Sequence, residues 1–274
     1  MTGGNEWNPR VWGRGANQWA EGSTDHTSTP IDTAATPPPL VQQANRAVTK
    51  QVVTMMIGDF APQVTQLTLP TIQAWAAKIG AEFRVIDRPV FHRPSVTYEK
   101  FQLYRLSRGY DWTIFIDADA LVHPDTPDWT EMVGADTVVF HALDMRLNRF
   151  RAGPYLRRSR SLAGACTWLT MFSQSCRDLW HPLDEEETSW EECVGQIQPT
   201  AAERASGHCS AEHLIDDYLV SENICRYGLK VATVIDLCRQ AGIPAGYYCH
   251  LYMTDPITKA REIMHKACEW GIWP

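Results

Sequence analysis

Hydrophobic residues along the chain form short runs that alternate with longer stretches of helical periodicity. Three runs rich in β-branched or aromatic residues predict strands, at 51–58, 82–87 and 112–116. Between them, apolar residues recur every three or four positions, first in a helix that Pro70 is expected to open and Gly80 to close, then over 97–110. This β-α-β-α-β order predicts a mostly parallel sheet with right-handed crossovers.

The second half of the chain continues the alternation. Further elements are expected as follows: a strand at 136–140, a strand leading into a helix at 161–172, a helix ending at Gly228, a strand at 229–236 and a short strand at 247–253. From Asp255 the tail is expected to be helical, with five apolar residues on one face: Ile257, Ala260, Ile263, Met264 and Ala267.

These elements define the expected domain organisation. One α/β domain spanning 49–274 accounts for all of them. Residues 1–48 are rich in Gly, Ser, Thr, Asn and Pro, show no sustained period, and are expected to form an N-terminal extension or linker.

Composition narrows the functional classes. The chain has 274 residues, of which 44% are hydrophobic, enough for a substantial core, and its formal net charge of −7 argues against a general attraction to nucleic acid or anionic membranes. No apolar stretch is long enough to span a bilayer and the first residues lack a secretory pattern, so we expect a soluble, cytoplasmic protein. The eight cysteines show no zinc-binding spacing and are expected to be reduced.

Two carboxylates, Asp117 and Asp119, follow the apolar run 112–116 directly. Acids do not belong inside a buried strand, but the carboxyl end of a strand is where open α/β sheets place their ligand crevice. On an irregular segment, both acids can reach one hard cation such as magnesium, manganese or calcium. A nucleotide diphosphate would fill the remaining coordination positions. The alternative is a solvated turn after a strand.

The segment YEKFQLYRLSRGYDWTIFIDADALVHP, at 98–124, resembles the donor site of GT-A glycosyltransferases. It is similar to the glycogenin-like family 8 and to galactosyl- and mannosyltransferases whose motif reads DADAL. The resemblance implies a Rossmann-like GT-A domain with a mostly parallel, mixed central sheet. It also implies Mn²⁺- or Mg²⁺-dependent transfer of a sugar from a UDP- or GDP-sugar to an acceptor hydroxyl. The implied metal ligands are Asp117, Asp119 and His250, although a core histidine is the alternative for His250.

The same resemblance implies further contacts to the donor. They fall on the first strand, its following loop and two charged residues: Thr54, Gly58, Asp59, Lys100 and Asp117. An exposed helical lysine is the alternative for Lys100. The sequence lacks the HxxGxxKPW run of family 8, so the resemblance assigns no firm phosphate contact to Lys259 or Lys266.

A second acid pair, Asp216 and Asp217, opens the helix that ends at Gly228. Acids at this position suit the positive end of a helix, which is one interpretation of the pair. The segment also resembles the acceptor-side acid pair of inverting GT-A enzymes, which implies that Asp217 is the catalytic base and Asp216 its neighbour in the catalytic site. Retaining families carry a similar segment, so the stereochemistry stays open.

The acceptor side is expected between the two acid pairs. Six arginines occur at 146–160, and by resemblance Arg157, Arg158 and Gly164 face the acceptor, which would suit an anionic glycan or a nucleic acid. A solvated loop is the alternative.

Two other functions are compatible with the sequence. One is a nucleotidyltransferase or sugar-phosphate pyrophosphorylase of related fold, disfavoured because no glycine-rich loop bearing Arg and Lys follows the first strand. The other is a non-catalytic module that binds polyanions through the arginines at 146–160.

Overall fold

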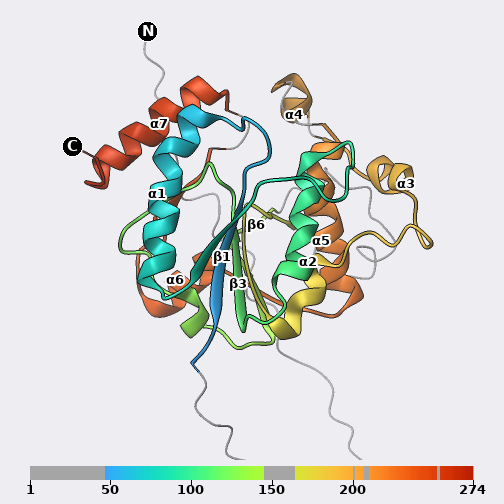
Figure 1. Ribbon diagram of the computed structural model, residues 1–274, viewed down its shortest axis with the longest axis horizontal. Coiled ribbons are helices and arrows are strands. Elements are labelled where there is room, and N and C mark those ends of the chain that lie inside the picture. The colour runs from blue at the N-terminus through green and yellow to red at the C-terminus, as the bar shows by residue number, and fades with distance from the viewer. Residues whose placement is uncertain (1–46, 145–163, 200, 207–209, 252–253, 274) are drawn as a thin grey trace, which may run out of the picture. The chain divides into compact units, whose positions relative to one another are not determined.

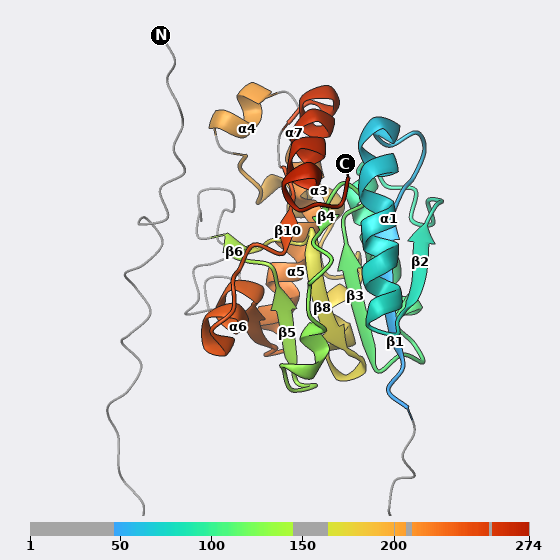
Figure 2. The ribbon, with the colours of Figure 1, turned by 90° about the vertical axis from the view of Figure 1, so that its left-hand side faces the viewer.

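The computed structural model describes residues 47–144, 164–199, 201–206, 210–251 and 254–273. Its centre is a six-stranded sheet in the order β2 (Glu82–Ile86), β1 (Lys50–Met55), β3 (Trp112–Ile116), β8 (Leu169–Ser173), β5 (Thr137–Phe140) and β9 (Lys230–Thr233). Five strands share one direction, and β8 runs antiparallel to both of its neighbours. In Figure 2, β2, β1, β3, β8 and β5 can be followed in this order across the sheet. The predicted fold class, α/β around a mostly parallel, mixed sheet, is confirmed.

Helices cover both faces of the sheet (Figure 1). On one face lie α1 (Pro62–Lys78) and α6 (Val234–Ala241), with α7 (Pro256–Glu269) packed against α1. On the other face lie α2 (Leu103–Leu106) and α5 (Ile215–Arg226). Every residue of β3 is therefore buried, as its unbroken apolar sequence predicts.

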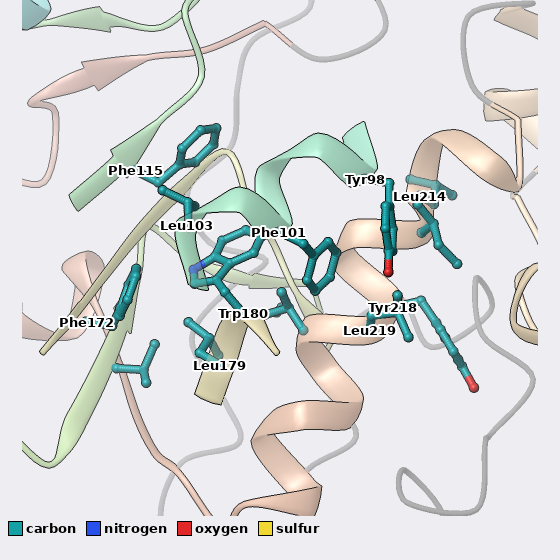
Figure 3. Close-up of a cluster of buried hydrophobic side chains, with 14 of the residues drawn as sticks. Tyr98, Phe101, Leu103, Phe115, Phe172, Leu179, Trp180, Leu214, Tyr218 and Leu219 are labelled. Carbon is teal, nitrogen blue, oxygen red and sulfur yellow. The ribbon is translucent and has the colours of Figure 1, made fainter. Parts of the chain in front are cut away.

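The α5 face of the sheet carries an aromatic core (Figure 3). Phe101 and Trp180 meet edge to face at 5.4 Å between ring centroids, and Trp180 also contacts Phe115 of β3. Leu219 of α5 is buried in the same cluster. Burying a side chain of this size stabilises the fold by about 1.5–3 kcal/mol. This packing holds two elements with charged site residues against the sheet: α5, and the 3₁₀ helix η2 (Val96–Gln102) that precedes α2.

Two short antiparallel pairs tie distant segments to the carboxyl edge of the sheet. β4 (Leu121–Val122) pairs with β10 (Tyr248–Cys249), so Cys249 lies opposite Leu121. β6 (Leu143–Asp144) pairs with β7 (Gly164–Ala165). The remaining elements are short helices: η3 (Trp129–Glu131), η5 (Gln174–Trp180), η6 (Glu212–Leu214), α3 (Trp190–Gly195) and α4 (Ala201–Ser206). The β4–β10 pair brings His250 next to the segment that holds Asp119.

The first predicted helix is longer than its periodicity indicates. Gly80, with φ 67°, lies just past its end as expected. Pro70, however, lies inside α1, and Pro62 occupies the first turn instead. The prediction for Pro70 was wrong because two prolines fit the preference for a helix start, and an exposed proline within a well-packed helix costs only one backbone hydrogen bond plus local strain.

Three other expected elements differ in extent. The strand expected at 229–236 ends at Thr233, whose hydroxyl accepts a hydrogen bond from the Asp236 N–H and caps α6. At 161–172, β7 and β8 form, and the helix that follows β8 is η5. Of the strand expected at 247–253, the part that forms is β10.

The tail helix forms as α7, with Asp255 as its N-cap, but its predicted apolar face is only partly buried. Ile263 and Ala267 are buried against α1, whereas Ile257 and Met264 are exposed. At about 100° per residue, the five residues lie within one sector of about 120° of this helix, as predicted, and Ile257 and Met264 form the exposed edge of that sector.

Some expectations fall on parts of the chain that the structure does not cover. Most of the predicted extension 1–48 and the arginines at 146–160 lie outside the described residues. Within the described ranges, no helix combines the length and hydropathy of a membrane span. Cys176, Cys193, Cys238 and Cys249 are free thiols, as expected of reduced cysteines.

Candidate active site

A cavity of about 530 Å³ opens at the carboxyl ends of the parallel strands. Met55 of β1, Asp117 after β3 and His141 after β5 all contribute to its wall. Because β8 runs the opposite way, its amino end lies at the same edge, and Thr167 and Trp168 line the cavity from there. The cavity therefore occupies the place where sheets of this kind bind ligands.

Three candidate metal ligands converge in this cavity. Nε2 of His250 lies 3.3 Å from Oδ1 of Asp119 and 3.8 Å from Oδ2 of Asp117. The ligand atoms of the three residues all lie within 4.8 Å of one another. The Asp117 N–H donates a hydrogen bond of 2.8 Å to the carbonyl of Trp168, and the β4–β10 pair holds His250 beside Asp119. Residues from distant parts of the sequence thus form one group.

Each carboxylate of this group also contacts a lysine through its other oxygen. Nζ of Lys100 lies 3.0 Å from Oδ1 of Asp117, and Nζ of Lys259 lies 2.6 Å from Oδ2 of Asp119. Burial by itself would raise the pKa of Asp119, but His250 and Lys259 together hold that pKa well below its usual range. Asp119 is therefore ionised across the physiological pH range.

The group fits a divalent cation of the hard type. It offers one oxygen from each carboxylate and one imidazole nitrogen, while the second oxygens are held by lysines. Carboxylate oxygens suit Mg²⁺ and Mn²⁺, and imidazole is an acceptable ligand for Mn²⁺. Three protein ligands leave coordination positions for a second molecule. Asp117, Asp119 and His250 are thus the residues that would hold the cation.

The second acid pair lies across the cavity, in the first turn of α5. Asp216 and Asp217 are both buried. Nζ of Lys100 lies 2.9 Å from Oδ2 of Asp216, so this one lysine joins the two acid pairs. The hydroxyl of Thr167 lies 2.7 Å from Oδ2 of Asp216 and 2.7 Å from Oδ1 of Asp217, and the Thr167 N–H donates to that same Oδ1 at 2.9 Å.

Burial and neighbouring charges shift the pKa values of Asp217 and Lys100 on this side of the cavity. Burial, and next the charge of Asp216, raise the pKa of Asp217 to about 7, although Lys100 and Thr167 oppose the shift. For Lys100, burial would lower the pKa, but Asp117 and Asp216 raise it above its ordinary value. Lys100 is a buried and permanently charged residue rather than the exposed helical lysine of the alternative interpretation.

An aromatic wall supports the metal-ligand group. The Trp168 indole stacks on the His250 ring, with 4.7 Å between centroids and 14° between planes. His141 lies 4.6 Å from Trp168 on the same centroid measure. Burial, and then His250, lower the pKa of His141 to about 4, so its imidazole is neutral at neutral pH.

Sequence reasoning missed Thr167, Trp168 and His141. For His141 a signal exists, because it follows the apolar run 136–140 as Asp117 follows 112–116. Thr167 and Trp168 precede their strand, and only the reversed direction of β8 brings them to the cavity. Lys259 also lines the cavity, whereas Lys266 pairs with Glu269 at 2.7 Å.

Several residues predicted to touch the donor or acceptor are not among the described residues that line the cavity. Thr54 is buried within β1, and Gly58 and Asp59 are exposed. Neighbouring residues of that segment line the cavity instead: Met55, Ile57, Phe60 and Ala61. Gly164 is buried in β7, and Arg157 and Arg158 lie outside the described residues.

The chain was compared with protein-family models, with curated proteins and with solved structures. No protein-family model matches the sequence, and no curated protein matches it as a relative. Among solved structures, the chain is similar to the crystal structure of a glycosyltransferase involved in the glycosylation of the major capsid of PBCV-1. The similarity covers 79% of this chain and 99% of that chain, at 9% sequence identity and a TM-score of 0.46. Likeness of this size assigns no activity, which is inferred below from the chain's own residues.

Proposed function

We propose that this protein is a metal-dependent glycosyltransferase, which moves a sugar from a nucleotide-diphosphate donor to an acceptor hydroxyl. One observation carries the proposal: the metal-ligand group and the buried acids Asp216 and Asp217 share one cavity and are joined through Lys100. Donor activation and proton removal need these two kinds of site side by side. The resemblance of the DADAL segment to GT-A enzymes supports the same reaction.

On the donor side, Asp117, Asp119 and His250 would hold Mn²⁺ or Mg²⁺. When bound, the cation supplies positive charge that offsets the negative charge developing on the departing diphosphate. Lys100 adds a fixed positive charge, because it is buried and held between Asp117 and Asp216. Ile57 and the exposed ring of Phe60 give the cavity an apolar rim on which a nucleobase would pack. UDP- and GDP-sugars are the proposed donors.

On the acceptor side, we assign the proton transfer to Asp217. The acceptor hydroxyl gives its proton to the Asp217 carboxylate, its oxygen bonds to the anomeric carbon of the sugar, and the bond from that carbon to the diphosphate oxygen breaks. A pKa near 7 suits a general base working near neutral pH. Thr167 positions this carboxylate by donating its backbone N–H. Asp216 helps to set the basicity of Asp217 through its charge.

The proposal for the acceptor rests on the sequence alone. An anionic glycan or a nucleic acid would suit the arginines at 146–160, including Arg157 and Arg158, and Gly164 would lie on the same side. These acceptor contacts are still predictions, and so are the donor contacts assigned to Thr54, Gly58 and Asp59.

A binding and turnover screen tests the proposed function. The full chain is titrated with UDP, GDP and their sugar conjugates by calorimetry, with Mn²⁺, with Mg²⁺ and with EDTA as the control. Release of the nucleoside diphosphate and the anomeric form of the product are followed in parallel. We expect at least one donor to bind only with metal and to be slowly hydrolysed when no acceptor is present.

Three results of the screen would speak against the proposal. One is the absence of metal-dependent binding for every donor. Another is the release of pyrophosphate from a nucleoside triphosphate and a sugar phosphate, which would identify a nucleotidyltransferase. The third is polyanion binding that needs neither metal nor Asp117 and Asp119, without turnover of any donor, which would identify a binding module.

A further inference from the structure

The candidate metal site carries its own positive charges. Asp117 and Asp119 bring two negative charges, and Lys100 and Lys259 bring two positive charges to the same carboxylates. Lys100 is shared with Asp216, so a divalent cation approaching Asp117, Asp119 and His250 meets a weaker attraction than two carboxylates without lysine partners would exert.

The two lysines differ in how firmly they are held. Lys100 is buried between Asp117 and Asp216, with the Thr167 hydroxyl 3.4 Å from its Nζ. Among the described residues, Lys259 forms its ion pair with Asp119 alone. It extends from the first turn of α7 to the cavity wall on a flexible four-carbon stem. Lys259 is therefore the lysine that can leave its carboxylate.

We propose that Lys259 is a displaceable internal counter-cation, which competes with the divalent cation for Asp119 and makes metal binding conditional on the nucleotide diphosphate. This inference rests on the proposed function. With no diphosphate, the ammonium group occupies Oδ2 of Asp119 and lowers the affinity for the metal. When a diphosphate is bound, Lys259 gains a second anionic partner, Asp119 is released and the added negative charge attracts the cation.

The coupling must be reciprocal. If the diphosphate tightens metal binding by a given factor, the metal tightens diphosphate binding by the same factor. We expect a factor of roughly 10 to 100. We expect Lys259 to contribute part of this coupling between metal and diphosphate. Removing it should therefore raise the affinity for the metal alone and reduce the gain in affinity that the diphosphate causes. The metal alone gains affinity, because Asp119 no longer has a competing partner, while the factor contributed by the diphosphate shrinks.

The test measures Mn²⁺ binding directly, without turnover. Free Mn²⁺ is followed by electron paramagnetic resonance during titration of the full chain, alone and with saturating UDP or GDP. Wild type is compared with Lys259→Met and Lys259→Arg, and with Lys266→Met, which removes one positive charge from the same helix away from the cavity. We expect Lys259→Met to bind Mn²⁺ alone about 10-fold more tightly than wild type. Lys259→Arg and Lys266→Met should resemble wild type.

The outcomes separate this inference from the proposed function. The counter-cation role would be overturned if wild type bound Mn²⁺ equally tightly with and without nucleotide. This comparison needs no variant. Unchanged or weaker Mn²⁺ affinity in Lys259→Met would overturn it as well, with the metal site intact. Failure of wild type to bind Mn²⁺ under any condition would instead overturn the proposed function. Circular dichroism and thermal melting confirm that each variant is folded.

Discussion

The two acid pairs of the cavity have the same chemistry but opposite electrostatics. Asp117 and Asp119 follow a buried strand, each meets a lysine, and the pKa of Asp119 lies well below its usual range because His250 and Lys259 outweigh burial. Asp216 and Asp217 open a helix and share Lys100 and Thr167, and burial together with Asp216 raises the pKa of Asp217 to about 7. Asp119 therefore stays ionised, whereas the pKa of Asp217 lies near neutrality.

The difference shows that environment, rather than residue type, sets the pKa values of Asp119 and Asp217. Permanently ionised oxygens suit a cation, whereas a carboxyl group that titrates near neutrality suits proton transfer. Lys100 contacts both pairs and provides a physical link between them. Substitutions at each pair should therefore change different measurements.

The largest effect is expected from Asp119→Asn, which removes a charged metal ligand at nearly constant volume. Metal-dependent turnover should fall by roughly 100- to 1000-fold, because the cation contributes several kcal/mol to stabilising the departing diphosphate. Mn²⁺ affinity, measured by calorimetry with UDP present, should fall in parallel. Asp125→Asn removes an exposed acid from the same segment and serves as the control. Wild-type Mn²⁺ affinity in Asp119→Asn would exclude it as a ligand.

Asp217→Asn should change turnover without changing metal binding. Loss of a general base lowers kcat by roughly 100-fold or more, while Mn²⁺ affinity stays within about twofold of wild type. The asparagine oxygen can still accept the Thr167 N–H, so local structure is preserved. Steady-state kinetics and Mn²⁺ titration measure the two quantities separately. Turnover within about threefold of wild type would rule out the role of Asp217 as base.

Trp168→Ala should weaken the metal site by a smaller amount. The indole stacks on His250, so its loss lets the imidazole rotate away from the carboxylates. Mn²⁺ affinity is expected to fall by about 10-fold, the effect typical of residues that orient a metal ligand. Trp168→Phe keeps an aromatic face against His250 and is the matched variant. Equal affinities in the alanine variant and wild type would show that stacking does not orient His250.

The last expected effect is on stability rather than on turnover or metal binding, and it appears in the pH dependence of unfolding. Because the pKa of Asp217 is raised to about 7 in the folded state, the native protein keeps a proton that the unfolded chain has released. Its contribution to the free energy of unfolding is therefore fully present below pH 4 and is lost as pH rises towards 7.

Asp217→Asn removes this dependence and supplies the test. Relative to wild type, the variant should gain about 3 kcal/mol in the free energy of unfolding between pH 5 and pH 8, because two pH units below a pKa of about 7 are each worth about 1.4 kcal/mol; urea denaturation at both pH values measures it. A constant difference between the two proteins across this range would show that Asp217 titrates normally.

Much of the fold can be predicted from the sequence, for a definite reason. Central strands buried on both faces carry apolar runs, so β3 and most of β1 are evident, and the edge strand β2 is recognised from the alternation of Phe83, Val85 and the residues between them. Gly80 and Gly228 mark helix ends. Helix starts are harder, since Pro62 and Pro70 fit the same preference. The start of α6 is masked because its Val-Ile pair continues the apolar run of β9.

Some residues of the site can likewise be located from the sequence, and others cannot. Asp117 and Asp119 can be located because they break an apolar run, and the resemblance to GT-A enzymes adds His250 and Lys100. Thr167 and Trp168 cannot be located this way, because an apolar run carries no information on strand direction. The pairing of Lys259 with Asp119 depends on how α7 packs against α1, which periodicity does not specify.

The most direct test of the central claim is a crystal of the full chain grown with Mn²⁺ and UDP, with anomalous diffraction recorded at the manganese edge. We predict one strong peak in contact with carboxylate oxygens of Asp117 and Asp119, with Nε2 of His250 and with the diphosphate. A manganese peak elsewhere, or a diphosphate bound away from these three residues, would contradict the account.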